Sequence, residues 1–159
     1  MDPKVVEVEG FQIVGITVRT TNEAEADASQ AKIPSLWGRY FAEGIGARND
    51  RGSAGSEAYG VYWGYESDAS GAYNVTAGAL VPERYQAEEG LSVLRINPGL
   101  YLAFHAAGAP QEVVPAIWGQ VWKYFSRPGR HKRSYTTDFE RYEGPAAVTI
   151  FIAVEASGE

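Results

Sequence analysis

Apolar residues recur with helical spacing in two separate stretches of the chain. In the first stretch, apolar side chains at intervals of three and four residues share one helix face: Ile33, Leu36, Trp37, Tyr40 and Phe41. The second stretch repeats this spacing and extends it by one turn: Val114, Ile117, Trp118, Val121, Trp122 and Phe125. We therefore expect a helix at about 33–41 that ends near Gly44, and a longer helix with Pro110 in its first turn that ends before Gly129.

Stretches rich in β-branched and aromatic residues predict strands around both helices. The expected strand material is residues 5–20, with a turn or bulge at Gly10 or Gly15, and then 57–66, 72–81, 91–96, 100–105, 134–142 and 146–154. Short connections cannot make parallel crossovers, so antiparallel pairing is expected. The chain is thus predicted to be α+β, with two main helices packed on an antiparallel sheet.

Two further stretches lie between these elements. Asn22 and Glu25 have the spacing of a capping box, whereas Pro34 argues against one uninterrupted helix from there. Residues 47–56 are polar and rich in glycine, which predicts a loop.

The second half of the chain repeats motifs of the first. Ile-Pro-Ser-Leu-Trp-Gly at 33–38 returns as Val-Pro-Ala-Ile-Trp-Gly at 114–119, an offset of 118 − 37 = 81. This predicts one duplicated domain over 1–159, with strand-strand-helix-strand-strand halves at about 5–81 and 91–155 and a linker at about 82–90. Two such halves related by a pseudo-twofold axis would leave a central cleft, the first candidate for a ligand site.

Composition and charge exclude several classes of function. The chain has 14 basic and 20 acidic residues and a net charge of −6, which argues against direct nucleic-acid binding and suits cationic small molecules. It has no cysteine, and its two histidines have no partner at metal-ligand spacing, so we expect neither a metal nor a cofactor. Without an apolar signal or membrane span, a cytoplasmic location with no membrane partner is expected. The basic cluster Arg127, Arg130, His131, Lys132 and Arg133 follows a helix end and is expected to be solvated.

The two halves differ at a position that bears on chemistry. In the strands, Ala-Tyr-Gly-Val-Tyr at 58–62 corresponds to Asp-Phe-Glu-Arg-Tyr at 138–142, an offset of 140 − 60 = 80. Where the first half has Gly60, the second therefore has Glu140 in the middle of a strand, with Tyr142 two residues on and so on the same face. One interpretation is an exposed glutamate paired with a neighbouring basic residue (Lys132, Arg133 or Arg141). The other is a carboxylate at the floor of an aromatic cleft, where burial without a partner costs free energy.

These motifs together resemble the gyrase-inhibitor-like (GyrI-like) small-molecule-binding domains, the effector-binding parts of many drug-responsive bacterial transcription activators. The resemblance covers about 5–154 and rests on Ile-Pro-x-Leu-Trp-x-x-Tyr-Phe, Tyr-Gly-Val-Tyr and Asp-Phe-Glu-x-Tyr in this order. It implies that Glu140 lies in the ligand cleft, with Tyr142 beside it, and faces cationic, lipophilic compounds. The candidate walls of the cleft are aromatic residues of the predicted helices and strands: Trp37, Tyr40, Tyr62, Trp118 and Trp122.

Three functions remain open, and the sequence leaves undecided whether the protein is an enzyme. The first is a stand-alone binding protein that sequesters or senses lipophilic, often cationic aromatic molecules; a sensor would need an unidentified DNA-binding partner protein. The alternative is a hydrolase of strained, electrophilic drugs such as cyclopropane-bearing alkylating agents, with Glu140 as base or charge stabiliser and Tyr142 activating the leaving carbonyl. The third is an interaction module that inhibits another protein through an acidic surface.

Overall fold

The computed structural model describes residues 3–45, 58–68, 70–82, 85–87, 89–127, 129, 131–143 and 146–155. Their strands are β1 (Lys4–Val8), β2 (Phe11–Thr21), β3 (Ala58–Trp63), β4 (Ala72–Val81), β5 (Ser92–Ile96), β6 (Gly99–Ala107), β7 (Arg133–Tyr142) and β8 (Ala147–Val154). The helices are α1 (Asn22–Glu25), α2 (Ile33–Ala42) and α4 (Pro110–Phe125). The predicted helices and strands are confirmed, while the loop predicted at 47–56 lies outside the described residues.

Proline and glycine set the ends of the longer helices. Pro34 and Pro110 lie in the first turns of α2 and α4, where a missing backbone N–H removes no helical hydrogen bond. Beyond the end of α2, Gly44 has a φ of 61°, a left-handed conformation that glycine adopts without strain. The apolar stripes predicted from the helical spacing supply buried side chains, among them Leu36 of α2 and Ile117 of α4.

The capping box predicted at Asn22 and Glu25 is wrong, because Asn22 is not the N-cap residue of α1. The N-cap of α1 is Thr21, whose hydroxyl accepts the N–H of Ala24 at 3.0 Å. The Glu25 carboxylate reaches the start of α2 instead. It accepts the backbone N–H groups of Lys32 at 2.8 Å and Ile33 at 3.2 Å. Because α2 has no cap from its own N-cap side chain, Glu25 supplies the negative charge at this helix terminus.

The eight strands form a single antiparallel sheet in the order β1-β6-β8-β7-β3-β4-β2-β5. Exchanging the corresponding strands of the two halves (β1 with β5, β2 with β6, β3 with β7, β4 with β8) and reading the order backwards returns the same order. The pseudo-twofold axis therefore passes between β3 and β7, where Gly60 pairs with Glu140. The first strand of each half crosses over, because β1 pairs with β6 and β5 pairs with β2.

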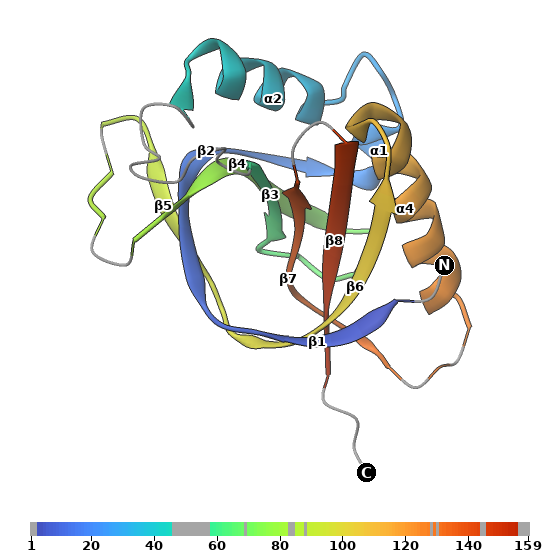
Figure 1. Ribbon diagram of the computed structural model, residues 1–159. Coiled ribbons are helices and arrows are strands. Elements are labelled where there is room, and N and C mark those ends of the chain that lie inside the picture. The colour runs from blue at the N-terminus through green and yellow to red at the C-terminus, as the bar shows by residue number, and fades with distance from the viewer. Residues whose placement is uncertain are drawn as a thin grey trace.

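The sheet curves strongly and carries both long helices on its outside (Figure 1). α2 packs on β2 and β4, and α4 packs on β6 and β8. Inside the curve lies an aromatic cluster that includes Tyr59, Phe139 and Phe151. Since each helix covers its own part of the sheet, the central pair β3–β7 lies between them.

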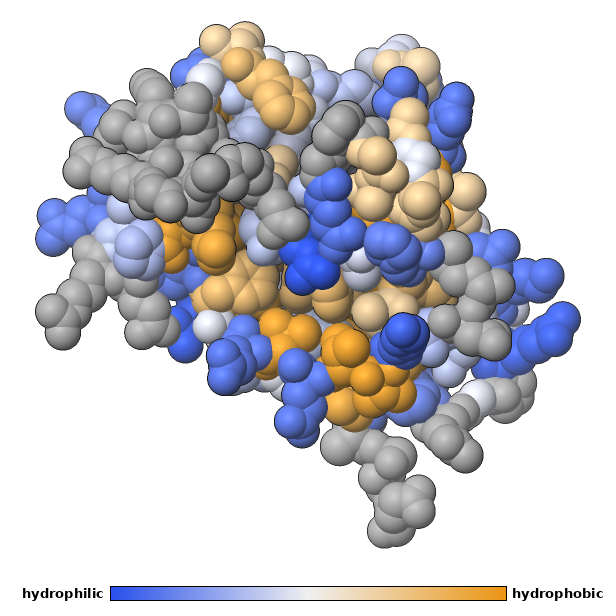
Figure 2. Space-filling view, viewed as in Figure 1, coloured by the Kyte–Doolittle hydropathy of each residue, from blue (hydrophilic) through white to orange (hydrophobic). Residues whose placement is uncertain are grey.

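Some apolar side chains reach the surface at the periphery. Figure 2 shows apolar atoms over α2 and over the lower part of the sheet, where β1 lies in the same view. Phe41 of α2 is 66% exposed and Val5 of β1 is 51% exposed. No helix in the described part of the chain is long and apolar enough to cross a membrane.

Candidate functional site

Strands β3 and β7 form the floor of the site between the helices. Because side chains alternate along a strand, Asp138, Glu140 and Tyr142 of β7 share the face that the helices cover. Gly60 of β3 stands opposite Glu140, and Tyr62 stands opposite Asp138. The floor therefore carries two carboxylates and two tyrosines at the centre of the pseudo-symmetric sheet.

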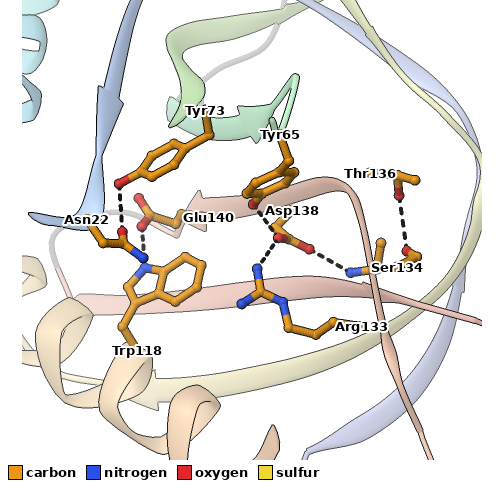
Figure 3. A network of polar contacts seen from close by, with 10 residues as sticks. Asn22, Tyr65, Tyr73, Trp118, Arg133, Ser134, Thr136, Asp138 and Glu140 are labelled. Atoms are coloured by element: carbon orange, nitrogen blue, oxygen red, sulfur yellow. Dashed lines mark hydrogen bonds and ion pairs between the residues drawn. The ribbon is translucent and has the colours of Figure 1, made fainter. Parts of the chain in front are cut away.

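Glu140 is a buried carboxylate, with 1% of its surface exposed. Its Oε2 accepts hydrogen bonds from the Tyr62 hydroxyl and from Nε1 of Trp118, both at 2.8 Å, and its Oε1 accepts from the Tyr142 hydroxyl at 2.7 Å. All three donors are uncharged, and no ion pair to Glu140 occurs among the described residues. Figure 3 shows the carboxylate beside the Trp118 indole.

The interpretation of Glu140 as an exposed residue paired with a neighbouring cation is wrong. Each candidate cation pairs with another acidic residue. Arg141 pairs with Glu143, Arg133 with Asp138, and Lys132 with Glu155. Arg141 cannot reach Glu140 because strand alternation turns it to the opposite face of the sheet, where its guanidinium lies 5.0 Å from the Phe151 ring centroid.

Burial raises the pKa of the Glu140 carboxyl above its ordinary value, although the hydrogen bonds from Trp118, Tyr142 and Tyr62 act in the opposite direction. Burial and the adjacent Glu140 also raise the pKa values of Tyr62 and Tyr142, so both hydroxyls stay protonated and act as donors. The site thus holds one carboxylate whose negative charge is solvated by neutral dipoles alone.

Gly60 provides the space that this carboxylate occupies. A Cβ atom at position 60 would lie 2.9 Å from Oε1 of Glu140 and 3.1 Å from Cζ2 of Trp37, closer than ordinary contacts. Trp37 in turn stacks on Tyr142, with ring centroids 5.1 Å apart. The difference between the two halves at this position is therefore complementary, since the glycine of one half admits the glutamate of the other.

A cavity of about 250 Å³ lies over the floor, between α1, the start of α2 and α4. Its aromatic and apolar walls are Ile33, Tyr62, Tyr65, Tyr73, Val114, Pro115, Trp118 and Trp122. Its polar lining consists of Asn22, Glu25 and Arg133. Glu140 lies directly behind this wall, because Tyr62 and Trp118 both line the cavity and both donate to its carboxylate.

The structure brings together only part of the predicted site. Tyr62, Trp118 and Trp122 line the cavity, whereas Trp37 and Tyr142 stack on each other outside its lining. Tyr40 is only 4% exposed and packs in the core beneath α2.

Of the cavity residues, sequence reasoning named only Tyr62, Trp118 and Trp122 as site residues, and those that it missed include Tyr73 and Arg133. Strand alternation from buried Val75 could have placed Tyr73 on the helix-covered face. The prediction that the basic cluster is solvated is wrong for Arg133, which is 7% exposed. Because Arg133 belongs to a run of basic residues, its sequence position does not indicate burial, and only the tertiary structure shows that it lines the cavity.

Asp138 differs from Glu140 in having a cationic partner. It accepts a hydrogen bond from Arg133 Nη2 at 2.7 Å, another from the Tyr65 hydroxyl, and the backbone N–H of Ala153 at 2.9 Å. The cavity wall and the side chains directly behind it thus hold three carboxylates (Glu25, Asp138 and Glu140) and one guanidinium. Because the anions outnumber the cation, the arrangement favours a positively charged occupant.

Comparisons with known proteins cover nearly the whole chain. A family model described as a GyrI-like small-molecule-binding domain matches residues 1–154. YobU of Bacillus subtilis (strain 168), named as a transcriptional regulator protein, is 24% identical over 91% of this chain and 92% of its own length.

Solved structures extend this likeness over nearly the whole chain. The integron cassette protein VCH_CASS2 from the mobile metagenome of Vibrio cholerae is 36% identical, with a TM-score of 0.83 over 97% of this chain and 96% of the other. SAV2435, solved bound to tetraphenylphosphonium, is 20% identical, with a TM-score of 0.73 over 98% of this chain and 95% of the other. The likeness to SAV2435 concerns the fold.

Proposed function

Because this chain belongs to the family of GyrI-like small-molecule-binding domains, we propose that it binds a lipophilic aromatic cation in the cavity between α1, α2 and α4. The observation that carries this proposal is Glu140, a carboxylate with 1% exposure and neutral hydrogen-bond donors only. A cation in the cavity, separated from Glu140 by the Tyr62 and Trp118 side chains, would supply the missing counter-charge. The tetraphenylphosphonium bound by SAV2435, which shares this fold, belongs to the same chemical class.

The energetics of such a site favour a delocalised cation. A unit charge separated from a carboxylate by one aromatic ring, about 7 Å away, is attracted by about 2 kcal/mol at an effective dielectric constant near 20, before desolvation is subtracted. A cation over the face of Tyr62 or Trp118 gains a further 0.5–2 kcal/mol, roughly, from each well-placed ring. A delocalised aromatic cation is weakly hydrated and therefore loses less on entry than a compact ammonium ion.

Two observations bear on what binding accomplishes. Glu140 is 1% exposed and does not line the cavity, which supports binding over hydrolysis because a general base must reach the proton that it removes from the substrate. The likeness to YobU, which is named as a transcriptional regulator protein, supports effector sensing over simple sequestration.

The test compares two ions of the same shape and opposite charge, tetraphenylphosphonium and tetraphenylborate, by tryptophan fluorescence titration. We expect wild-type protein to bind the cation with a Kd in the micromolar range and to reject the anion. Glu140→Gln should weaken cation binding at least about tenfold, or 1.4 kcal/mol. Glu7→Gln, which removes an equal charge from exposed β1, should change the Kd less than about twofold.

Equal binding of both ions, or equal binding by wild type and Glu140→Gln, would contradict the proposal. Mass spectrometry of the recovered ligand separates binding from catalysis. Unchanged ligand is expected. If the protein instead converts a strained, electrophilic drug to a product, and Glu140→Gln abolishes this conversion, the protein is a hydrolase.

A further inference from the structure

We propose that the ligand of this cavity carries, besides its cationic aromatic part, an uncharged oxygen acceptor such as a carbonyl group, and that Arg133 donates to this oxygen. This inference rests on the proposed function, because it names a second recognition element within the same cavity. It assigns Arg133 a role in binding that is separate from its ion pair with Asp138.

Arg133 has donors to spare at the cavity wall. A guanidinium carries five N–H groups. Among the described residues, Arg133 donates one hydrogen bond, from Nη2 to Asp138, and its buried Nε has no partner. The residue is 7% exposed and lines the cavity. The N–H groups that Asp138 leaves unused can therefore donate to an acceptor that enters the cavity beside the guanidinium.

The guanidinium is held in place before any ligand arrives. Asp138 fixes one edge, and is itself fixed by the Tyr65 hydroxyl and a backbone N–H. The Tyr135 ring covers one face, with its centroid 4.3 Å from Cζ of Arg133. Tyr135 has a φ of 52°, uncommon outside glycine, within the irregular segment of β7 between Arg133 and Asp138. This rigidity lowers the entropic cost of ordering Arg133 around a ligand.

Figure 3 shows how the guanidinium is oriented. One terminal nitrogen points to Asp138, and the other terminal nitrogen points towards the side on which Trp118 stands. Since Trp118 and Arg133 both line the cavity, a ligand stacked against the indole would bring a substituent within reach of that nitrogen.

The charge balance selects an uncharged acceptor over an anionic one. Asp138 already neutralises Arg133 at a distance of 2.7 Å. A ligand carboxylate at this point would meet the negative charges of Asp138 and Glu140 with no unpaired cation to offset them. A carbonyl oxygen accepts the same N–H group and adds no charge. The two polar elements of the cavity therefore recognise different parts of one ligand.

The test uses two permanent cations of nearly equal shape, 4-acetyl-N-benzylpyridinium and 4-ethyl-N-benzylpyridinium, which differ in a carbonyl oxygen. In wild-type protein we expect the acetyl compound to bind about tenfold more tightly. Arg133→Lys keeps the charge that pairs with Asp138 but loses the planar set of donors, so the ratio of the two Kd values should fall below about twofold. Glu140→Gln should weaken both compounds and leave their ratio unchanged.

A Kd ratio near one in wild-type protein, or an unchanged ratio in Arg133→Lys, would overturn the inference. Tighter binding of 4-carboxy-N-benzylpyridinium than of the acetyl compound would also overturn it. If Arg133→Lys does not fold, the double variant Arg133→Met with Asp138→Asn removes both charges together, and its ratio should likewise fall. If both pyridinium cations bind and lose affinity in Glu140→Gln, but their Kd ratio is near one, only the Arg133 subsite is refuted. Failure of both cations and of tetraphenylphosphonium to bind refutes the proposed function as well.

Discussion

Glu140 and Asp138 are two buried carboxylates on the same face of β7, yet their surroundings give them opposite roles. Asp138 has a guanidinium at 2.7 Å and serves the structure as half of a buried ion pair. Glu140 has two hydroxyls and an indole N–H, which solvate its charge without cancelling it. A charge left unbalanced in a buried site is costly, and the cation of the proposed function would balance it.

The binding of a permanent cation should depend on the ionisation of Glu140. Burial raises the pKa of Glu140, so its carboxylate is protonated at a higher pH than an exposed glutamate would be. The protonated form lacks the charge that attracts the ligand. We therefore expect tetraphenylphosphonium affinity to be constant above the raised pKa and to fall as the pH is lowered through it, beginning above the ordinary value of 4.5.

Titrations between pH 8 and pH 4 check this expectation, since the phosphonium itself does not ionise. Glu140→Gln is the matched control and should show weak affinity with little pH dependence while the protein stays folded. The same pH dependence in wild type and Glu140→Gln would assign the effect to another group.

At the scale of elements, the site depends on how the helices are placed over the sheet. α2 begins against Glu25, whose carboxylate also accepts the hydroxyl of Thr20 at 2.7 Å. One side chain thus ties together the end of β2, the start of α2 and the cavity wall. α4 contributes Trp118, whose indole N–H reaches the centre of the sheet. These contacts fix the helices on either side of β3 and β7, and the cavity lies between the helices over this central pair of strands.

Removal of the Glu25 carboxylate should therefore loosen α2. Glu25→Ala leaves two N–H groups at the start of α2 without their acceptor and is expected to reduce the free energy of unfolding by about 1 kcal/mol, within the 0.5–2 kcal/mol typical of lost N-terminal caps. Glu23→Ala, in the exposed first turn of α1, is the matched control and should cost less than about 0.5 kcal/mol. Urea denaturation measures both, and equal effects of the two variants would show that the cap contributes nothing specific.

At the scale of the whole molecule, the two pseudo-symmetric halves share one sheet. β1 completes the part of the sheet that belongs to the second half, and β5 completes the part that belongs to the first. The inner aromatic cluster also draws residues from both halves, such as Tyr59 and Phe151. Neither half therefore has a complete sheet or core of its own.

This interdependence predicts a single cooperative unfolding transition. Far-ultraviolet circular dichroism follows the whole sheet and both helices. Tryptophan fluorescence follows both halves of the chain, through Trp37 in α2 and Trp63 in β3 as well as Trp118 and Trp122 in α4. We expect the urea midpoints from the two probes to coincide within experimental error. Two separated midpoints would indicate halves that unfold independently.

The sequence by itself determined the elements and part of the site. Helical spacing and β-branched stretches located α2, α4 and the strands, because each pattern reports the local backbone period. The offset between repeated motifs matched Gly60 with Glu140, and strand alternation placed Glu140 and Tyr142 on one face. These inferences succeed because they concern neighbours along the chain or a repeat within it.

Only the tertiary structure decided which partners meet. Tyr62 is 78 residues from Glu140 and Trp118 is 22 residues away, so their hydrogen bonds depend on strand register and on the position of α4. The same holds for Arg133, taken from a basic run into the cavity wall, and for β1, paired across the pseudo-twofold axis. A shift of one residue in register would turn each side chain to the other face, and periodicity alone does not encode that choice.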